Sequence, residues 1–208
     1  MNRTSTKAVS YICGIDLEGV NRDLTNGGVN LQTDRVTEVA AVLWEVESSS
    51  PVKVYSELIF EADHLPINQD LLDLNQISNE MLKTWGLKDN ELKDFLLKIA
   101  EVMKKADYIM AHNGPLYDRP MLGGLFNRYG IPVPETPWID TATDIEFPKV
   151  MRGRSMALLE HAHGIISPFP HRAICDVLAM LRIASQYDFE RMAKISDSPK
   201  ITLVAKLT

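Results

Sequence analysis

The feature that most constrains this chain is an apolar run near its start that ends in two carboxylates. Residues 11–15 (YICGI) lead directly into Asp16-Leu17-Glu18. Alternate residues of a strand point to the same face, so Asp16 and Glu18 are expected side by side at the end of a buried strand over 9–17. Two like charges there repel and are costly to desolvate, and the usual solutions are a bound proton or a metal ion. Hard oxygen ligands on a rigid strand suit Mg²⁺ or Mn²⁺. The alternative is a strand that ends at the surface with two solvated acids.

The remaining pattern indicates an α/β chain. Strands are expected over 9–17, 35–47, 52–60, 107–113 and 136–139, with a polar flap over 21–34 and a turn over 48–51. Helices are expected over 68–74, 78–85, 90–106, 118–129, 141–147, 155–163, 173–187 and 189–195, and the tail over 201–207 alternates weakly. The pattern predicts an antiparallel meander within one mixed five-stranded sheet flanked by helices. We expect a single domain over 1–208, with a core at about 9–188 and a tail over 189–208.

Composition narrows the class of protein. Apolar residues make up 45% and charged residues 24%, and the two cysteines form no disulfide framework, so we expect a cytoplasmic protein. No apolar run approaches the roughly 18–20 residues that cross a bilayer, so no membrane partner is expected. The net charge of −6 argues against coating of duplex DNA, but not against binding of a nucleic-acid end in a metal-filled cleft.

Three later residues are further candidates for a site. Asp118 follows an expected buried strand and begins the expected helix over 118–129, where it has the residue type of an N-cap. Asp176 lies early in an apolar helix. His171 precedes that helix, so it is expected on the incoming loop, from which it could reach the site and move a proton near neutral pH. The alternative for each is a capping or solvated residue.

In this order, the segments resemble the three motifs of the DEDDh 3′–5′ exonucleases, a family that includes the proofreading subunit of the bacterial replicative polymerase. Residues 16–18 match its Asp-x-Glu, and residues 171–176 (HRAICD) match its His-x-Ala-x-x-Asp. The second motif runs from His112-Asn113 to Asp118, with five residues between His and Asp where the family has four. Residues 34–42 are similar to the family's second strand, and residues 75–78 (NQIS) to its His-x-Ile-Thr stretch.

The resemblance covers about residues 11–187 and implies a ribonuclease H-like fold. It implies a catalytic set whose carboxylates hold two divalent cations, Mg or Mn, while a histidine acts as general base. The four metal ligands would be Asp16, Glu18, Asp118 and Asp176, and the base would be His171.

The reaction implied is hydrolysis of the terminal phosphodiester of single-stranded or frayed DNA, from the 3′ end, with release of nucleoside 5′-monophosphates. The expected substrate contacts are the backbones of Leu17 and Gly19 and the side chain of Asn113. A polymerase or replication protein is the further partner that the resemblance suggests.

Three other functions stay open at this point. The first is an exoribonuclease or oligonucleotide nuclease of the same family, because no residue visibly reads a 2′-hydroxyl and RNA would serve as substrate. The second is a catalytically silent nucleic-acid-binding module on the same fold. The third is a two-metal phosphoesterase that acts on small nucleotides.

Overall fold

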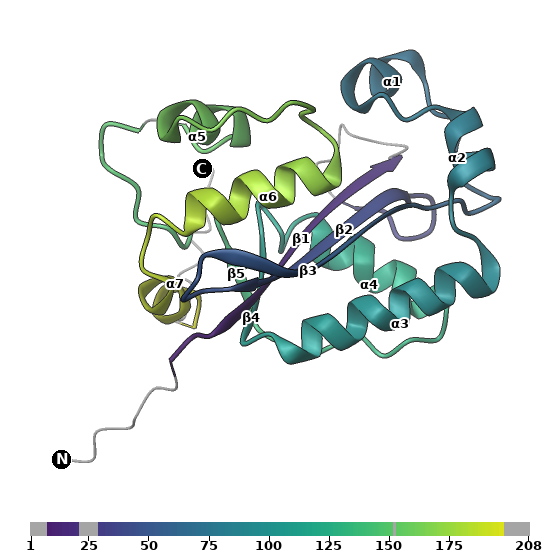
Figure 1. Ribbon diagram of the computed structural model, residues 1–208. Helices are drawn as coiled ribbons and strands as arrows, with labels where there is room; N and C mark the ends of the chain where they lie inside the picture. Colours follow the sequence, from purple (N-terminus) through teal and green to yellow (C-terminus); the bar gives the residue numbers. More distant parts are fainter. Residues whose placement is uncertain (1–7, 21–28, 152, 198–208) are drawn as a thin grey trace, which may run out of the picture.

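The structure, a computed structural model, describes residues 8–20, 29–151 and 153–197, and all statements below concern these residues. Figure 1 shows one twisted sheet with helices on both faces. The strands are β1 (Tyr11–Val20), β2 (Arg35–Glu45), β3 (Ser50–Leu58), β4 (Tyr108–Ala111) and β5 (Trp138–Asp140), in the order β3-β2-β1-β4-β5. The first three strands pair antiparallel, whereas β4 is parallel to β1 and β5 to β4. The predicted meander and mixed five-stranded α/β sheet are confirmed.

Helices on the two faces bury two separate apolar cores. The helices are α1 (Gln69–Asn75), α2 (Asn79–Trp85), α3 (Asp89–Lys105), α4 (Asp118–Arg128), α5 (Met156–His163), α6 (Ala173–Ala184) and α7 (Phe189–Ser196). Helices α3 and α4 cover one face, α6 crosses the other, and α1 and α2 lie beyond the tip of β1 (Figure 1). Cys13, Ile15 and Leu17 join the α3–α4 core, while Ile12 joins the α6 core. The alternation of β1 therefore directs Asp16 and Glu18 toward the α6 face.

Helix α6 lies very close to β1. A Cβ atom at Gly14 would stand 2.7 Å from Cδ1 of Leu181 and 3.1 Å from Cγ1 of Val177, so any larger residue would force these side chains to shift. Strand β2 is buried over all but its last residue, since it lies inside the sheet with helices on both faces. The two strands that approach the site are thus held rigidly by packing on both sides.

Several predicted boundaries are corrected by the structure. Strand β1 continues to Val20, so Asp16 and Glu18 lie within the strand rather than at its end. Helix α6 stops at Ala184, and buried Phe189 and Met192 on α7 extend the core past residue 188. Within the expected flap, residues 29–34 include a turn at 31–33, whereas residues 21–28 and the weakly alternating tail over 201–207 lie outside the described residues.

The helix expected over 141–147 is wrong, because this segment forms turns. Oδ1 of Asp140 accepts the backbone N–H of Ala142 at 2.9 Å, and Oδ2 of Asp144 accepts that of Asp140 at 2.9 Å. Such side-chain bonds give the backbone an alternative to helical pairing. In the described part of the chain, no helix is both long enough and apolar enough to span a membrane.

Candidate functional site

Three of the expected site residues meet beside the outer half of β1. Glu18 comes from β1, Asp176 from the first turn of α6, and His171 from the loop before α6. One ligand atom from each of these side chains lies within 4.8 Å of the other two. Two carboxylates and an imidazole at this separation form a donor set that a divalent cation can bridge.

The backbone of His171 is fixed in an unusual conformation. Its φ is 58°, a left-handed value that non-glycine residues adopt at a cost and that is found at functional sites more often than elsewhere. Its N–H donates to Oδ2 of Asp176 at 3.1 Å, and its imidazole is exposed. The predicted loop position of His171 is confirmed, and the exposed ring can meet a water molecule or a substrate.

We expected Asp118 to be the N-cap of its helix, but it is the first residue of α4. The capping position is occupied by Tyr117. The Asp118 side chain is 2% exposed, and its Oδ1 atom has no hydrogen-bond partner among the described residues. The N-terminus of a helix favours a carboxylate, but a buried oxygen without a donor is costly. A bound cation would satisfy that oxygen.

The longer second-motif loop folds as a tight turn before Asp118. Asn113 has a φ of 57°, its N–H donates to Oδ1 of Asp140 at 2.9 Å, and its carbonyl accepts the N–H groups of Leu116 and Tyr117. This tight turn takes up the additional residue. His112, the first residue of the motif, instead bonds through Nδ1 to Oγ1 of Thr141 at 2.9 Å.

The electrostatics of these acids show that they are crowded together. The pKa of Asp16 is raised well above its ordinary value, first by desolvation and then by the charges of Asp118, Asp176 and Glu18. Desolvation likewise raises the pKa of Asp118 strongly, that of Glu18 to about 8 and that of Asp176 to about 6. Asp16 is not one of the three residues of the donor set, but its charge interacts with those of Glu18, Asp176 and Asp118. Mutual repulsion of this kind is relieved by a proton or a metal ion.

The donor set fits the expected divalent cations. Its carboxylate oxygens are hard ligands of the kind that Mg²⁺ and Mn²⁺ prefer, and the unpartnered Oδ1 of Asp118 is an oxygen of the same kind. Without a cation, Glu18 would hold a proton near neutral pH, because burial raises its pKa to about 8.

The three expected substrate contacts differ in what they can offer. The Leu17 side chain is 4% exposed and packs in the α3–α4 core, so it has only its backbone for a ligand. A Cβ at Gly19 would lie 2.7 Å from the Tyr117 hydroxyl and 3.0 Å from the carbonyl oxygen of Arg35, which makes this tip of β1 a close-packed backbone surface. The Asn113 residue is exposed, and its backbone organises the loop described above.

Sequence reasoning missed three polar residues around this site. Asn75, 3% exposed at the end of α1, donates from Nδ2 to Oε2 of Glu18 at 3.1 Å. Glu38 lies opposite Glu18 in the β1–β2 register and binds Arg172, the residue after His171. The family-like stretches over 34–42 and 75–78 contained Glu38 and Asn75, but only the strand register and the placement of α1 reveal their contacts.

The likeness of this chain to known proteins is found in structure and not in sequence. No protein-family model matches the chain, and no curated protein matches its sequence. The nuclease domain of 3′hExo, a DEDDh family member bound to rAMP, gives a TM-score of 0.65 at 16% identity, with 86% of this chain and 91% of that chain covered. A structure described as 3′-end-specific recognition of a histone mRNA stem-loop by a 3′-exonuclease gives a TM-score of 0.66 at 15% identity, with 87% of this chain and 82% of that chain covered.

A bacterial enzyme shows the same likeness over part of its length. E. coli exonuclease I in complex with a dT13 oligonucleotide gives a TM-score of 0.67 at 17% identity, over 85% of this chain. This chain spans about two-fifths of exonuclease I, since 40% of that structure is covered. Each of these comparisons covers at least 85% of this chain, so the chain has the ribonuclease H-like fold of these 3′-exonucleases.

Proposed function

We propose that this protein is a metal-dependent 3′–5′ exonuclease that removes nucleoside 5′-monophosphates from single-stranded or frayed DNA. The observation that carries the proposal is the meeting of Glu18, His171 and Asp176 within 4.8 Å, beside the buried and unsatisfied Asp118. These residues stand at the three motif positions of a chain with the DEDDh exonuclease fold. We propose that the sequence over 1–208 acts as one exonuclease domain, in the reducing cytoplasm, where its two unpaired cysteines stay reduced.

Each residue of the site has a separate task in this proposal. Asp16, Glu18, Asp118 and Asp176 would hold two divalent cations, Mg²⁺ or Mn²⁺. When bound, the ions would supply Lewis-acid stabilisation of charge on the phosphoryl group and the leaving 3′ oxygen. The exposed imidazole of His171 takes the proton from the attacking water. The bond that breaks joins the terminal phosphorus to the 3′ oxygen of the preceding nucleotide.

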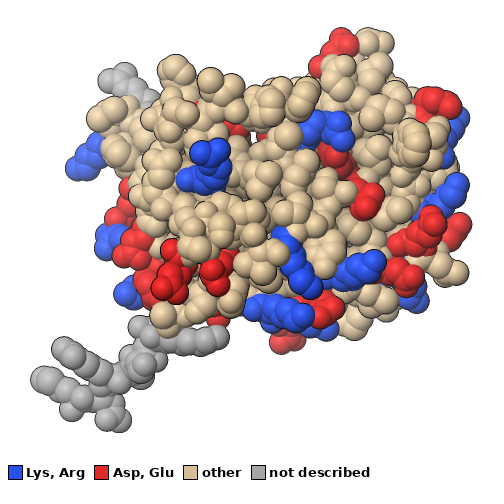
Figure 2. Space-filling model, in the orientation of Figure 1, with Lys and Arg blue, Asp and Glu red and all other residues tan. Residues whose placement is uncertain are grey.

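The surroundings favour the end of a single strand over the body of a duplex. On the face shown in Figure 2, Lys and Arg side chains are interspersed with Asp and Glu and form no continuous basic surface there. Exposed apolar side chains flank the motifs instead: Leu116, 73% exposed, stands two residues before Asp118, and Phe169, 66% exposed, two before His171. Aromatic side chains stack on unpaired bases regardless of sequence, and an aliphatic side chain can pack against a base face. Leu17, Gly19 and Asn113 are proposed to contact the terminal nucleotide.

RNA is the competing substrate, because the structurally similar proteins include complexes with rAMP and an mRNA stem-loop as well as with dT13. The deciding experiment digests 5′-labelled single-stranded DNA, 3′-recessed DNA and a matching RNA, with Mg²⁺, Mn²⁺ or EDTA. We expect a ladder that shortens from the 3′ end in the presence of metal and is faster on DNA. A faster ladder on RNA would identify an exoribonuclease.

Matched variants separate chemistry from folding. Asp176→Asn should abolish the ladder. Glu146→Gln should not, since Glu146 is exposed and pairs with Arg191 of α7. A folded wild-type protein that binds Mn²⁺ and oligonucleotide without producing a ladder would be a silent binding module. Turnover of nucleotides but not of polymers would indicate a small-nucleotide phosphoesterase, and either result would refute the proposal.

A further inference from the structure

The acidic site contains a fourth element, because Glu18 has a second glutamate directly opposite. In the antiparallel β1–β2 register, Glu18 pairs with Glu38. Glu38 is only 2% exposed and precedes Val39, whose side chain packs in the opposite core, so it faces α6 as Glu18 does. Like charges directly opposite on neighbouring strands are destabilising, so the charge of Glu38 needs a partner.

Arg172 is that partner, and the contact is bidentate. Its Nη2 lies 2.7 Å from Oε1 of Glu38, and its Nε lies 3.1 Å from Oε2. Oε2 of Glu38 also accepts the backbone N–H of Ala173, the first residue of α6, at 2.9 Å. The N-cap residue of α6 makes no side-chain capping bond, and the carboxylate of Glu38 on β2 bonds to the helix start instead.

This fastening acts on residues of the proposed reaction. Arg172 directly follows His171 and lies four residues before Asp176, one helical turn away. The guanidinium charge also reaches Glu18, whose pKa it lowers. A planar cation held by one carboxylate is unavailable to the neighbouring one, since its donors are already directed.

We infer that Glu38 is a positioning residue of the proposed nuclease site. It holds the start of α6 so that His171 and Asp176 face Glu18, and it keeps the Arg172 guanidinium from pairing with Glu18 in place of a cation. The inference rests on the proposed function for its effect on the reaction, but its effect on metal binding can be measured independently of any nuclease activity.

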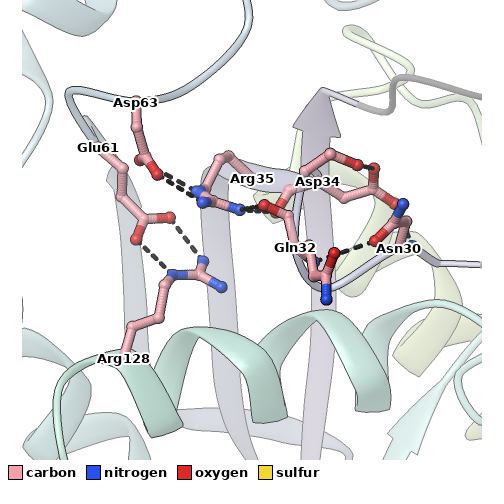
Figure 3. Close-up of polar contacts among 8 residues, drawn as sticks. Asn30, Gln32, Asp34, Arg35, Glu61, Asp63 and Arg128 are labelled. Atoms are coloured by element: carbon pink, nitrogen blue, oxygen red, sulfur yellow. Dashed lines mark hydrogen bonds and ion pairs between the residues drawn. The ribbon is translucent and has the colours of Figure 1, made fainter.

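A second buried pair in the chain provides a matched control. Glu61, 7% exposed, accepts two hydrogen bonds from Arg128, each 2.7 Å long (Figure 3). Arg128 ends α4, ten residues after Asp118 and thus about 15 Å along the helix. Glu61→Gln therefore breaks a pair of the same chemistry away from the acids.

The experiment compares wild type, Glu38→Gln, Glu61→Gln, Arg172→Gln and the double variant Glu38→Gln/Arg172→Gln. We measure the melting temperature, kcat and KM on single-stranded DNA, and Mn²⁺ affinity by calorimetry. Glu38→Gln should lower both kcat and Mn²⁺ affinity at least tenfold, with KM within twofold of wild type. The double variant should recover Mn²⁺ affinity to within threefold of Arg172→Gln, because the freed guanidinium that competes for Glu18 is gone.

The outcomes separate this inference from the proposed function. If Glu38→Gln matches Glu61→Gln in kcat and Mn²⁺ affinity, Glu38 is merely structural and the inference is overturned. If wild type shows no nuclease activity, the proposed function fails, and the Mn²⁺ affinities alone then test the inference. Should Glu38→Gln not fold, Arg172→Lys replaces it. That variant keeps the charge but loses the bidentate geometry, so unchanged Mn²⁺ affinity in it would equally overturn the inference.

Discussion

Glu18→Gln is expected to abolish nuclease activity and yet stabilise the metal-free protein at pH 8. Burial raises the pKa of Glu18 from 4.5 to about 8. The folded protein therefore retains a proton that the unfolded chain releases near pH 4.5. The stability that this proton contributes is complete below pH 4.5 and is lost as the pH rises toward 8.

The size of the effect follows from that pKa. Each pKa unit corresponds to about 1.4 kcal/mol, so by pH 8 ionisation of Glu18 costs the folded state on the order of 4 kcal/mol. Solvent reaches part of this side chain and screens its charge, which reduces the expected cost to about 2 kcal/mol. A glutamine avoids the cost, and its carbonyl oxygen can still accept the hydrogen bond that Asn75 donates to Glu18.

Urea unfolding followed by circular dichroism measures this difference. In EDTA, the free energy of unfolding of Glu18→Gln should exceed that of wild type by about 2 kcal/mol at pH 8 and by much less at pH 5. Saturating Mn²⁺ should reverse the order at pH 8, because it binds the folded wild type and removes the repulsion. Glu57→Gln, a change of an exposed glutamate on β3, is the control. A metal-free Glu18→Gln that is less stable than wild type at pH 8 would refute the reasoning.

Three further predictions concern other parts of the molecule. His171→Ala should lower kcat at pH 7 by about 10² or more while Mn²⁺ binding persists in calorimetry; retained turnover would eliminate His171 as the base. Gly14→Ala should lower the free energy of unfolding by about 1–3 kcal/mol, because the added Cβ meets Leu181 at 2.7 Å, and an unchanged urea midpoint would show that α6 moves aside at little cost. Phe169→Ala should raise KM for a single-stranded oligonucleotide about fivefold or more with kcat unchanged, as initial rates would show, and an unchanged KM would exclude base stacking at this exposed ring.

Much of the site could be predicted because it depends on short-range geometry. The period of a strand places Asp16 and Glu18 on one face, and the prolines at 168 and 170 favour a start at or after His171 for the helix that carries Asp176. Those relations need no knowledge of tertiary structure. The sheet was predictable for the same reason, since each strand carries its own apolar pattern.

The errors arose where side chains bond to the local backbone. The segment over 141–147 has the composition of a helix, but Asp140 and Asp144 direct their carboxylates to nearby N–H groups and hold it in turns. Asp118 has the residue type of an N-cap, yet the turn begun by Asn113 moves the helix start forward by one residue. Neither effect is visible in periodicity, because the first depends on individual side-chain bonds and the second on the left-handed φ of Asn113.

The role inferred for Glu38 could not be reached from sequence for a different reason. Its position opposite Glu18 is fixed by the β1–β2 register, and fourteen residues, 21–34, separate these two strands, so no short turn sets that register. Its contact with Arg172 spans 134 residues of chain.

By contrast, Glu61 and Arg128 form a pair of the same chemistry whose loss should cost stability alone. The two pairs differ in where their arginines lie relative to the helices and the site residues. Arg128 ends a helix, whereas Arg172 immediately precedes one and lies between His171 and Asp176 in the chain. The same kind of ion pair that stabilises one end of α4 therefore orients His171 and Asp176 at the start of α6.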